Sequence, residues 1–312
     1  MSKLKGLLLT EGMHGMISQV EGLAKALDLD YFHEKIELTS FWKMIPPKFT
    51  PISKSVFKNK IDKDYDMIIS CGRKSVIPSI YLKNNINKKI INIHIQDPKV
   101  SLNHFNYVVV PEHDSIDGAN VIKTKGAIHY LTIEEINKNR AYLENKVNKD
   151  KEILTLILGG PTKYYKYTQK NLENIFSIIK KNIEDNNLQL IVISSIRTPK
   201  NAISLARNYF SAESLIIDEV DKKAYLSSLS LSKFIVVTCD SSSMISEAAL
   251  TGKPIYIAQI PSERNDYRFK KFRNLFKELN IIRELNDKLE NWSYEKLDET
   301  NRIAKEIKKK LP

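Results

Sequence analysis

The chain has 312 residues, a formal net charge of +12 at pH 7 and 42% hydrophobic residues. This length allows one large domain or two of ordinary size, and the apolar content is sufficient for a substantial core. No apolar run approaches the roughly 20 residues of a membrane span, and no signal-peptide core is evident, so we expect a cytoplasmic protein. Its two cysteines, Cys71 and Cys239, form no metal or redox motif, and the basic residues are spread over both halves, which argues against a nucleic-acid-binding surface.

The first predicted strand, 4–10, leads through a glycine-containing loop into a helix predicted from about residue 18 to 27. In doubly wound folds this loop is the usual place for ligand contact. It is not a GxGxxG loop, so it gives little support to a dinucleotide site. His14 is a candidate base here, against the alternative of a solvated bystander, and Gln19 is a candidate cleft residue.

Residues 37–64 combine apolar side chains with lysines and prolines. Prolines argue against a long uninterrupted helix. Apolar anchors beside lysines suit an anionic membrane surface or a lipid-linked partner. The alternative, which we favour from the sequence, is an ordinary segment that covers the core with lysine stems.

Three further strands are predicted in the first half, at 67–70, 90–95 and 107–110, and each ends in a polar cluster. Carboxyl ends of parallel strands line the ligand crevice of an open sheet. Arg73 and Lys74 would stand unfavourably at a helix N-terminus, so we expect a bound anion there or side chains that reach water. The candidates that these clusters add are Arg73, Asp97, His113 as a base and Asp114 as its orienting carboxylate.

A charged helical stretch at 134–150 is typical of a connecting helix, and a new buried strand at 153–158 opens the second half. That strand ends in Gly159 and Gly160, which let a ligand approach the backbone closely. The next strand, 189–194, precedes Arg197, whose guanidinium suits bidentate phosphate binding.

Residues 234–257 predict a strand, a serine-rich turn, a helix from 243 to 251 and another strand. A helix N-terminus after a parallel strand offers free N–H groups and a positive dipole end to a phosphate. Ser241, Ser242 and Ser243 add hydroxyl donors, and Glu247 lies one turn further on. The alternative is that the serines only cap the helix and that Glu247 is solvated.

Strands and helices alternate in both halves, which predicts an α/β protein with two Rossmann-like domains that face each other across a cleft. We place the domains at 1–145 and 146–312. The last helix, from about residue 294 to 311, is a candidate to pack back on the first domain.

The order of these motifs resembles the Elm-type family, called mitochondrial-fission-protein-like after its plant members, over nearly the whole chain. The two-domain layout resembles the GT-B architecture of nucleotide-sugar glycosyltransferases. The serine-rich turn followed by Glu-Ala-Ala-x-x-Gly-x-Pro is similar to the donor motif of the peptidoglycan GlcNAc transferase. The stretches that carry the family resemblance are 15–19 with 22–24, 70–75, 96–98, 110–114, 159–161, 194–199 and 238–248.

The resemblance implies that the second domain holds the nucleoside-diphosphate-sugar donor and the first domain holds the acceptor. Glu247 would hold the ribose. The residues implied for the diphosphate are Gly159, Gly160, Thr162, Arg197, Ser241, Ser242 and Ser243, and those expected on the acceptor side or in the cleft are Gln19, Arg73, Asp97 and Asp114.

We therefore expect a metal-independent glycosyltransferase with no cofactor, in which His14 or His113 deprotonates an acceptor hydroxyl. The expected partners are a nucleotide-sugar and a hydroxyl acceptor, with a lipid-linked or cell-envelope glycan as the candidate, and no nucleic acid. Peripheral contact with the inner face of the membrane is part of this expectation. Two alternatives stay open, namely a nucleotide-sugar epimerase or isomerase and a non-catalytic Elm-type scaffold.

Overall fold

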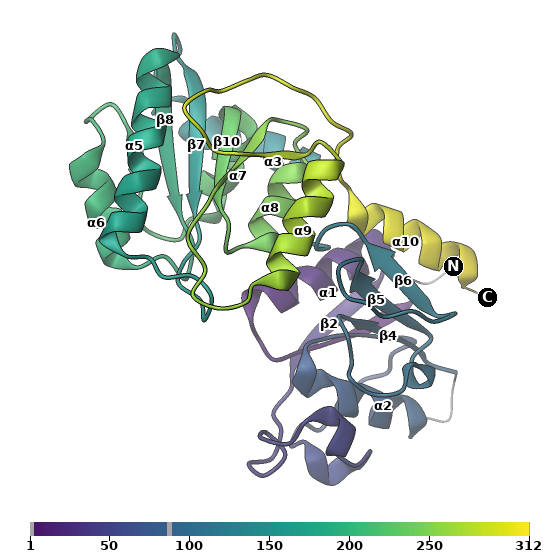
Figure 1. Cartoon of the computed structure of the whole chain (residues 1–312). Helices are drawn as coiled ribbons and strands as arrows, with labels where there is room; N and C mark the ends of the chain where they lie inside the picture. Colours follow the sequence, from purple (N-terminus) through teal and green to yellow (C-terminus); the bar gives the residue numbers. More distant parts are fainter. Residues whose placement is uncertain (1–2, 86–88, 312) are drawn as a thin grey trace. The chain divides into compact units, whose positions relative to one another are not determined.

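The computed structural model describes residues 3–85 and 89–311 (Figure 1). The chain divides into two compact units, Met1–Tyr130 with Asp298–Pro312, and Leu131–Leu297. The division thus falls before residue 131, ahead of the boundary after residue 145 that we expected from the charged helical stretch. The last helix belongs to the first unit. Within the described residues, no helix has the length and apolar character needed to cross a bilayer.

The first unit contains a six-stranded sheet with the order β2-β1-β3-β4-β5-β6, in which every neighbouring pair is parallel. Strands such as β3 are buried along their whole length, which is why they read as continuous apolar runs. The strands are β1 (Lys5–Thr10), β2 (Asp30–Lys35), β3 (Met67–Cys71), β4 (Ile91–Ile95), β5 (Tyr107–Pro111) and β6 (Val121–Thr124), and the α-helices are α1 (His14–Ala26), α2 (Val76–Asn84) and α10 (Glu299–Lys310).

Helices α1 and α10 pack together in one core of the first unit. Val20 and Leu23 of α1 are buried in the same apolar cluster as Ile303 and Ile307 of α10. The side-chain hydroxyl of Thr300 also exchanges hydrogen bonds with the backbone of His129, at 3.0 and 2.8 Å. These contacts explain why the C-terminal helix returns to the first unit.

The second unit has a six-stranded sheet with the order β12-β11-β10-β7-β8-β9, again with every neighbouring pair parallel. The strands are β7 (Glu152–Leu158), β8 (Leu188–Ser194), β9 (Leu215–Ile217), β10 (Ser232–Thr238), β11 (Ile255–Ala258) and β12 (Ile282–Glu284), and the helices are α3 (Ile133–Lys138), α4 (Ala141–Glu144), α5 (Gln169–Asp185), α6 (Lys200–Tyr209), α7 (Lys222–Leu231), α8 (Ser242–Ala249) and α9 (Tyr267–Glu278).

The expected α/β class is confirmed, because each unit is a Rossmann-like parallel sheet with helices. Helix α5 begins directly after its cap Thr168, whose hydroxyl accepts from the N–H of Asn171, and it buries one apolar face. The single connecting helix expected at 134–150 is instead two short helices, α3 and α4, and both pack against α7.

Each sheet has a point at which the strand order reverses. In the first unit the reversal lies between β1 and β3, and in the second unit it lies between β7 and β10. The crevice outside the carboxyl ends of such a strand pair is where open α/β sheets bind ligands. The chain that leaves β7 and β10 is therefore the first place to look for a site.

Candidate active site

Asp240, which follows β10 at the reversal point of the second unit, is the centre of a buried polar network. Its side chain has no exposed surface. One carboxylate oxygen, Oδ2, accepts hydrogen bonds from the N–H of Gly160 at 3.1 Å and from Nη2 of Arg197 at 2.9 Å. The other, Oδ1, accepts from the hydroxyl of Tyr167 at 2.6 Å. Burying a carboxylate costs free energy, and hydrogen bonds of this kind offset that cost.

Arg197 is held in a fixed orientation while part of it stays accessible. Besides the contact with Asp240, its Nη1 donates to the carbonyl oxygen of Gly160 at 3.1 Å. The side chain is nevertheless 42% exposed. Because a guanidinium carries five N–H donors, the remaining ones are available to an anion.

The two glycines after β7 are required by neighbouring protein atoms. A Cβ on Gly159 would lie 2.2 Å from Oδ2 of Asp240, and a Cβ on Gly160 would lie 2.0 Å from the carbonyl oxygen of Arg197. We expected the glycines to make room for a ligand. The structure shows that they make room for Asp240 and for the turn that carries Arg197.

That turn, residues 195–198, is tied to the end of β7. The hydroxyl of Ser195 donates to the carbonyl oxygen of Gly159 at 3.0 Å, and Oγ1 of Thr198 lies 2.6 Å from the same oxygen. Thr162 is occupied in another turn, because its Oγ1 accepts from the N–H groups of Tyr164 and Tyr165 at 3.1 and 3.2 Å.

The serine-rich turn opens helix α8, as the sequence predicts, although the helix runs from Ser242 to Ala249. Ser241 is its N-cap, and its hydroxyl oxygen accepts from the N–H of Met244 at 3.4 Å. Ser242 and Ser243 are the first helical residues and are partly exposed. Apart from the capped N–H of Met244, the N–H groups at the start of this helix lack a partner within the helix, so they can face an anion.

Glu247 lies one turn into α8 and is partly buried. Desolvation raises the pKa of its carboxyl group to about 7, although the hydroxyl of Tyr225, which donates to Oε2 at 2.7 Å, acts in the opposite direction. Its charge therefore changes near neutral pH, unlike that of an ordinary surface glutamate.

A second buried cluster supports the chain just before Asp240. Arg273 of α9 donates from Nη1 to the carbonyl oxygen of Cys239 at 3.2 Å and to the hydroxyl of Tyr165 at 3.1 Å, and that hydroxyl donates to Oδ2 of Asp266 at 2.7 Å. Burial opposes ionisation of Asp266, but hydrogen bonds from Tyr165, Lys270 and Arg273 outweigh it and lower the pKa to about 2.

In the first unit, the reversal point is occupied by an ion pair. Nζ of Lys74 lies 2.9 Å from Oε2 of Glu11, and the N–H of Lys74 donates to Oε1 at 3.1 Å. Arg73 donates from Nη2 to the carbonyl oxygens of Lys43 and Ile45 at 3.2 and 2.9 Å. Both cations thus have protein partners, while Arg73 is exposed and Lys74 is partly exposed, in agreement with the expectation that these side chains reach water. A bound anion at this position stays a prediction.

The two candidate bases lie on separate parts of the first sheet. His14 is exposed and is the first residue of α1, not a loop residue, since that helix begins four residues earlier than expected. Nε2 of His113, after β5, lies 3.9 Å from Oδ1 of Asp114. Strands β3 and β4 lie between β1 and β5, so the strand ends that carry the histidines are about 14 Å apart.

The remaining candidates of the first unit also contact neighbouring protein groups. Oε1 of Gln19 lies 3.6 Å from Sγ of Cys71. Asp97 forms an ion pair with Lys99 and accepts from its N–H at 2.9 Å. Across the described residues, no group of three or more His, Cys, Asp or Glu side chains is arranged to hold a metal ion.

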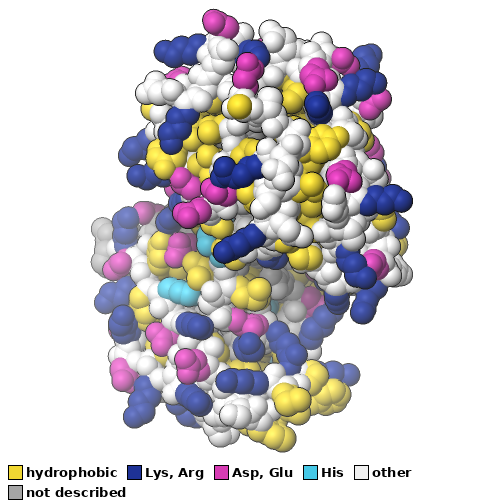
Figure 2. Space-filling model, turned by 90° about the vertical axis from the view of Figure 1, so that its left-hand side faces the viewer, with side chains coloured by type: hydrophobic (Ala, Val, Ile, Leu, Met, Phe, Trp, Pro, Cys, Tyr) yellow, Lys and Arg dark blue, Asp and Glu magenta, His cyan; other side chains and the backbone are white. Residues whose placement is uncertain are grey.

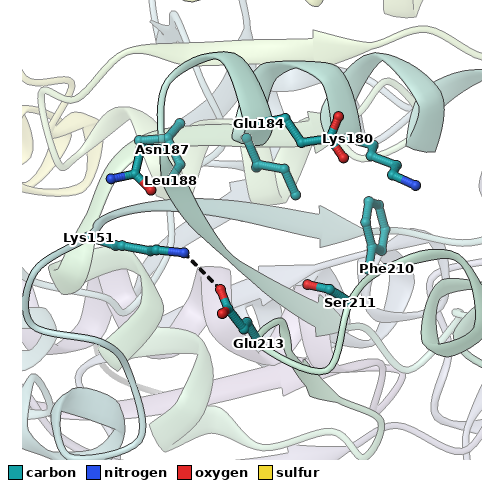
Figure 3. Close-up of a pocket in the computed structure, with 9 residues that line it drawn as sticks. Lys151, Lys180, Glu184, Asn187, Leu188, Phe210, Ser211 and Glu213 are labelled. Atoms are coloured by element: carbon teal, nitrogen blue, oxygen red, sulfur yellow. Dashed lines mark hydrogen bonds and ion pairs between the residues drawn. The ribbon is translucent and has the colours of Figure 1, made fainter.

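A surface pocket of the second unit lies away from this network (Figure 3). It encloses about 170 Å³, and Lys151 and Glu213 meet across one side of it at 2.7 Å. Lys151 precedes β7 and Leu188 begins β8, so the pocket is at the amino ends of the strands. Ligands of open parallel sheets bind at the opposite, carboxyl ends.

Comparisons of the sequence identify its relatives. The family model described as Mitochondrial fission ELM1 matches residues 14–311. The chain is 27% identical to the uncharacterized protein RP120 of Rickettsia prowazekii. The alignment covers 82% of this chain and 83% of that protein. Over 78% of its length the chain is 23% identical to the mitochondrial fission protein ELM1 of Arabidopsis thaliana, and it spans 64% of that relative.

Comparisons of the structure identify the fold. The UDP-GlcNAc 2-epimerase of Methanocaldococcus jannaschii aligns with a TM-score of 0.54 and 15% identity, over 98% of this chain and 99% of that one. MurG of Acinetobacter baumannii aligns with a TM-score of 0.51 and 9% identity, over 98% and 99%. The fold is therefore the GT-B-like fold that the sequence predicted.

Proposed function

The chain belongs to the mitochondrial fission ELM1 family, and from that premise we propose that it is a metal-independent glycosyltransferase that uses a nucleoside-diphosphate-sugar. The observation that carries the proposal is the placement of Arg197. Its guanidinium is fixed by Asp240 and by the backbone of Gly160, it is 42% exposed, and it lies on a strand end next to the reversal point of the second sheet.

The diphosphate is the part of the donor that this arrangement fits best. Arg197 supplies fixed donors, and the first turn of α8 supplies N–H groups and the positive end of a helix dipole. The hydroxyl groups of Ser242 and Ser243 are partly exposed on the same turn. A phosphate bound there gains charge-assisted hydrogen bonds without a metal ion.

We assign the ribose to Glu247. Its carboxylate, when ionised, accepts hydrogen bonds from two neighbouring hydroxyl groups, and it lies one turn beyond the N-terminus of α8, to which we assign the diphosphate. The raised pKa makes this contact sensitive to pH, because only the ionised form accepts from both hydroxyls.

In the proposed reaction, an acceptor hydroxyl oxygen forms a bond to the anomeric carbon of the sugar while the bond from that carbon to the diphosphate oxygen breaks. The proton of the hydroxyl passes to a histidine of the first unit, for which His14 and His113 are the candidates. Arg197 and the N-terminus of α8 stabilise the charge that develops on the departing nucleoside diphosphate.

We propose a lipid-linked glycan as the acceptor. The support for it is an exposed apolar and lysine-rich segment of the first unit, residues 38–61, which would bring a lipid-borne hydroxyl near the protein. The GT-B-like fold is compatible with both transferases and epimerases, so the acceptor is the part of the proposal that distinguishes them.

The test is a product assay with purified protein and a series of nucleotide-sugars. A transferase releases the nucleoside diphosphate only when a hydroxyl acceptor, such as a polyprenyl-linked sugar, is present. Conversion of the nucleotide-sugar in the absence of any acceptor would identify an epimerase instead. Failure of every nucleotide and nucleotide-sugar to bind would contradict both enzymatic functions and would favour a scaffold protein.

A further inference from the structure

Residues 38–61 of the first unit display large apolar side chains to solvent. Phe41 is 68% exposed, Met44 is 82% exposed and Phe49 is 69% exposed, and Ile52 follows at 40%. They lie within a short stretch of chain, whereas the other large exposed apolar side chains of the described residues are dispersed. Hydrophobic side chains project at the lower edge of the face in Figure 2, with Lys and Arg side chains beside them.

The same segment carries charge of one sign. Between Leu38 and Ile61 the chain has no aspartate or glutamate, and its five lysines are all exposed. The whole chain has a net charge of +12 but contains 37 acidic residues. The absence of acidic residues between Leu38 and Ile61 is therefore a property of this segment and not of the chain as a whole. These lysines are Lys43, Lys48, Lys54, Lys58 and Lys60.

The segment is also held firmly in place. Leu38 and Phe57 are buried in the core and form an antiparallel bridge, and the N–H of Lys58 donates to the carbonyl oxygen of Glu37 at 2.8 Å. Arg73 donates hydrogen bonds to the carbonyl oxygens of Lys43 and Ile45. Two 3₁₀ turns, Pro47–Phe49 and Lys54–Val56, shape the rest. The exposed side chains are thus presented on a fixed backbone.

From the sequence we favoured a segment that merely covers the core. The structure shows that Leu38, Val56 and Phe57 do cover it, while Phe41, Met44 and Phe49 lie on the outside. Burial of the core therefore accounts for one set of apolar residues and leaves the other set unexplained. Exposed apolar residues grouped in this way mark an interaction site.

We infer that residues 38–61 form a docking surface for an anionic phospholipid bilayer. Phe41, Met44 and Phe49 enter the boundary between headgroups and acyl chains, and the lysines bind lipid phosphates. A bilayer suits side chains that protrude, because it needs no complementary pockets, whereas a protein partner would have to supply one for each anchor. The inference concerns the first unit only and does not depend on the proposed transfer reaction.

The experiment is co-sedimentation of the full chain with vesicles of phosphatidylglycerol and phosphatidylcholine, compared with vesicles of phosphatidylcholine alone. We expect binding to the anionic vesicles, weaker binding at high salt and little binding to neutral vesicles. The triple variant Phe41→Ser, Met44→Ser, Phe49→Ser should lower the partition coefficient by at least about tenfold. Val220→Ser, which removes a side chain that is 60% exposed in the second unit, is the matched control and should bind like the wild type.

Thermal unfolding of each variant shows whether the substitutions leave the fold intact, as expected for exposed side chains. The inference is overturned if the wild type does not bind anionic vesicles, or if a folded triple variant binds them as well as the wild type. It is also overturned if the triple variant only converts a dimer of this chain to a monomer, since the surface would then be an interface between copies.

Discussion

Nη2 of Arg197 lies 2.9 Å from Oδ2 of Asp240, although the two residues follow different strands, β8 and β10, with β7 between them. One member of the pair is buried and the other is 42% exposed. The buried carboxylate thus fixes a cation at the carboxyl end of the sheet, where part of the cation remains accessible. The pair lies at the centre of the buried network that also includes Gly160 and Tyr167.

The first prediction concerns the stability of that pair. Asp240→Ala leaves the N–H of Gly160 without its acceptor in the interior and leaves the hydroxyl of Tyr167 only Oγ1 of Thr238, so we expect a loss of about 2–4 kcal/mol in the free energy of unfolding. The control is Asp218→Ala, which removes the exposed ion pair with Arg207 and should cost about 1 kcal/mol or less. Urea unfolding measures the free energy of unfolding of both variants. Equal losses in the two variants would contradict a structural role of Asp240 in the buried network.

The second prediction concerns the glycines. Gly159→Ala places a methyl group against Asp240 and should lower the free energy of unfolding by about 2 kcal/mol or more. Gly15→Ala is the matched control, because a Cβ at Gly15 meets no atom within 4 Å and alanine favours a helix. We expect that variant to be as stable as the wild type or more so. A harmless alanine at residue 159 would mean that the approach of Asp240 is not a constraint.

The third prediction is a pH dependence set by Glu247. Its folded-state pKa of about 7 lies above the unfolded value of 4.5, so the folded protein binds more protons than the unfolded chain between these pH values. The contribution of Glu247 to the free energy of unfolding should be largest below about pH 4.5. It should fall by at most about 3 kcal/mol as the pH rises to 7.

Glu247→Gln keeps an acceptor for the hydroxyl of Tyr225 and removes the titration. Its free energy of unfolding should therefore depend less on pH than that of the wild type over this range. Exposed Glu278 provides the control, since Glu278→Gln makes the same change of side chain on the surface. Identical pH profiles for the wild type and Glu247→Gln would contradict the assignment of a raised pKa.

The local architecture of the second unit could be predicted from the sequence because its signals are local. The apolar run, the serine cap and Gly252 predict β10, α8 and β11, and most ends of these elements are correct to within one or two residues. The prediction that the two glycines follow β7 and that Arg197 follows β8 is also correct. Strands β2, β6 and β12 were missed, because β2 and β6 have mixed polarity and β12 is short.

The contacts of the site could not be predicted in the same way. The role of Asp240 could not be predicted, since its partners Gly160, Tyr167 and Arg197 are brought together by the order of the strands and not by sequence spacing. No local pattern marks Arg273 of α9 as a buried residue. The carbonyl partners of Arg73 belong to Lys43 and Ile45, which lie 30 and 28 residues earlier in the chain, so sequence spacing gives no sign of them.

The most direct test of the central claim is thermal unfolding of the wild type, Arg197→Ala and Arg207→Ala with a series of nucleoside diphosphates and their sugars. A ligand at 100 times its dissociation constant should stabilise the wild type by about 2.7 kcal/mol. We expect one nucleoside diphosphate to stabilise the wild type and Arg207→Ala, and to have little effect on Arg197→Ala. Equal stabilisation of all three proteins, or of none, would contradict a donor site built around Arg197.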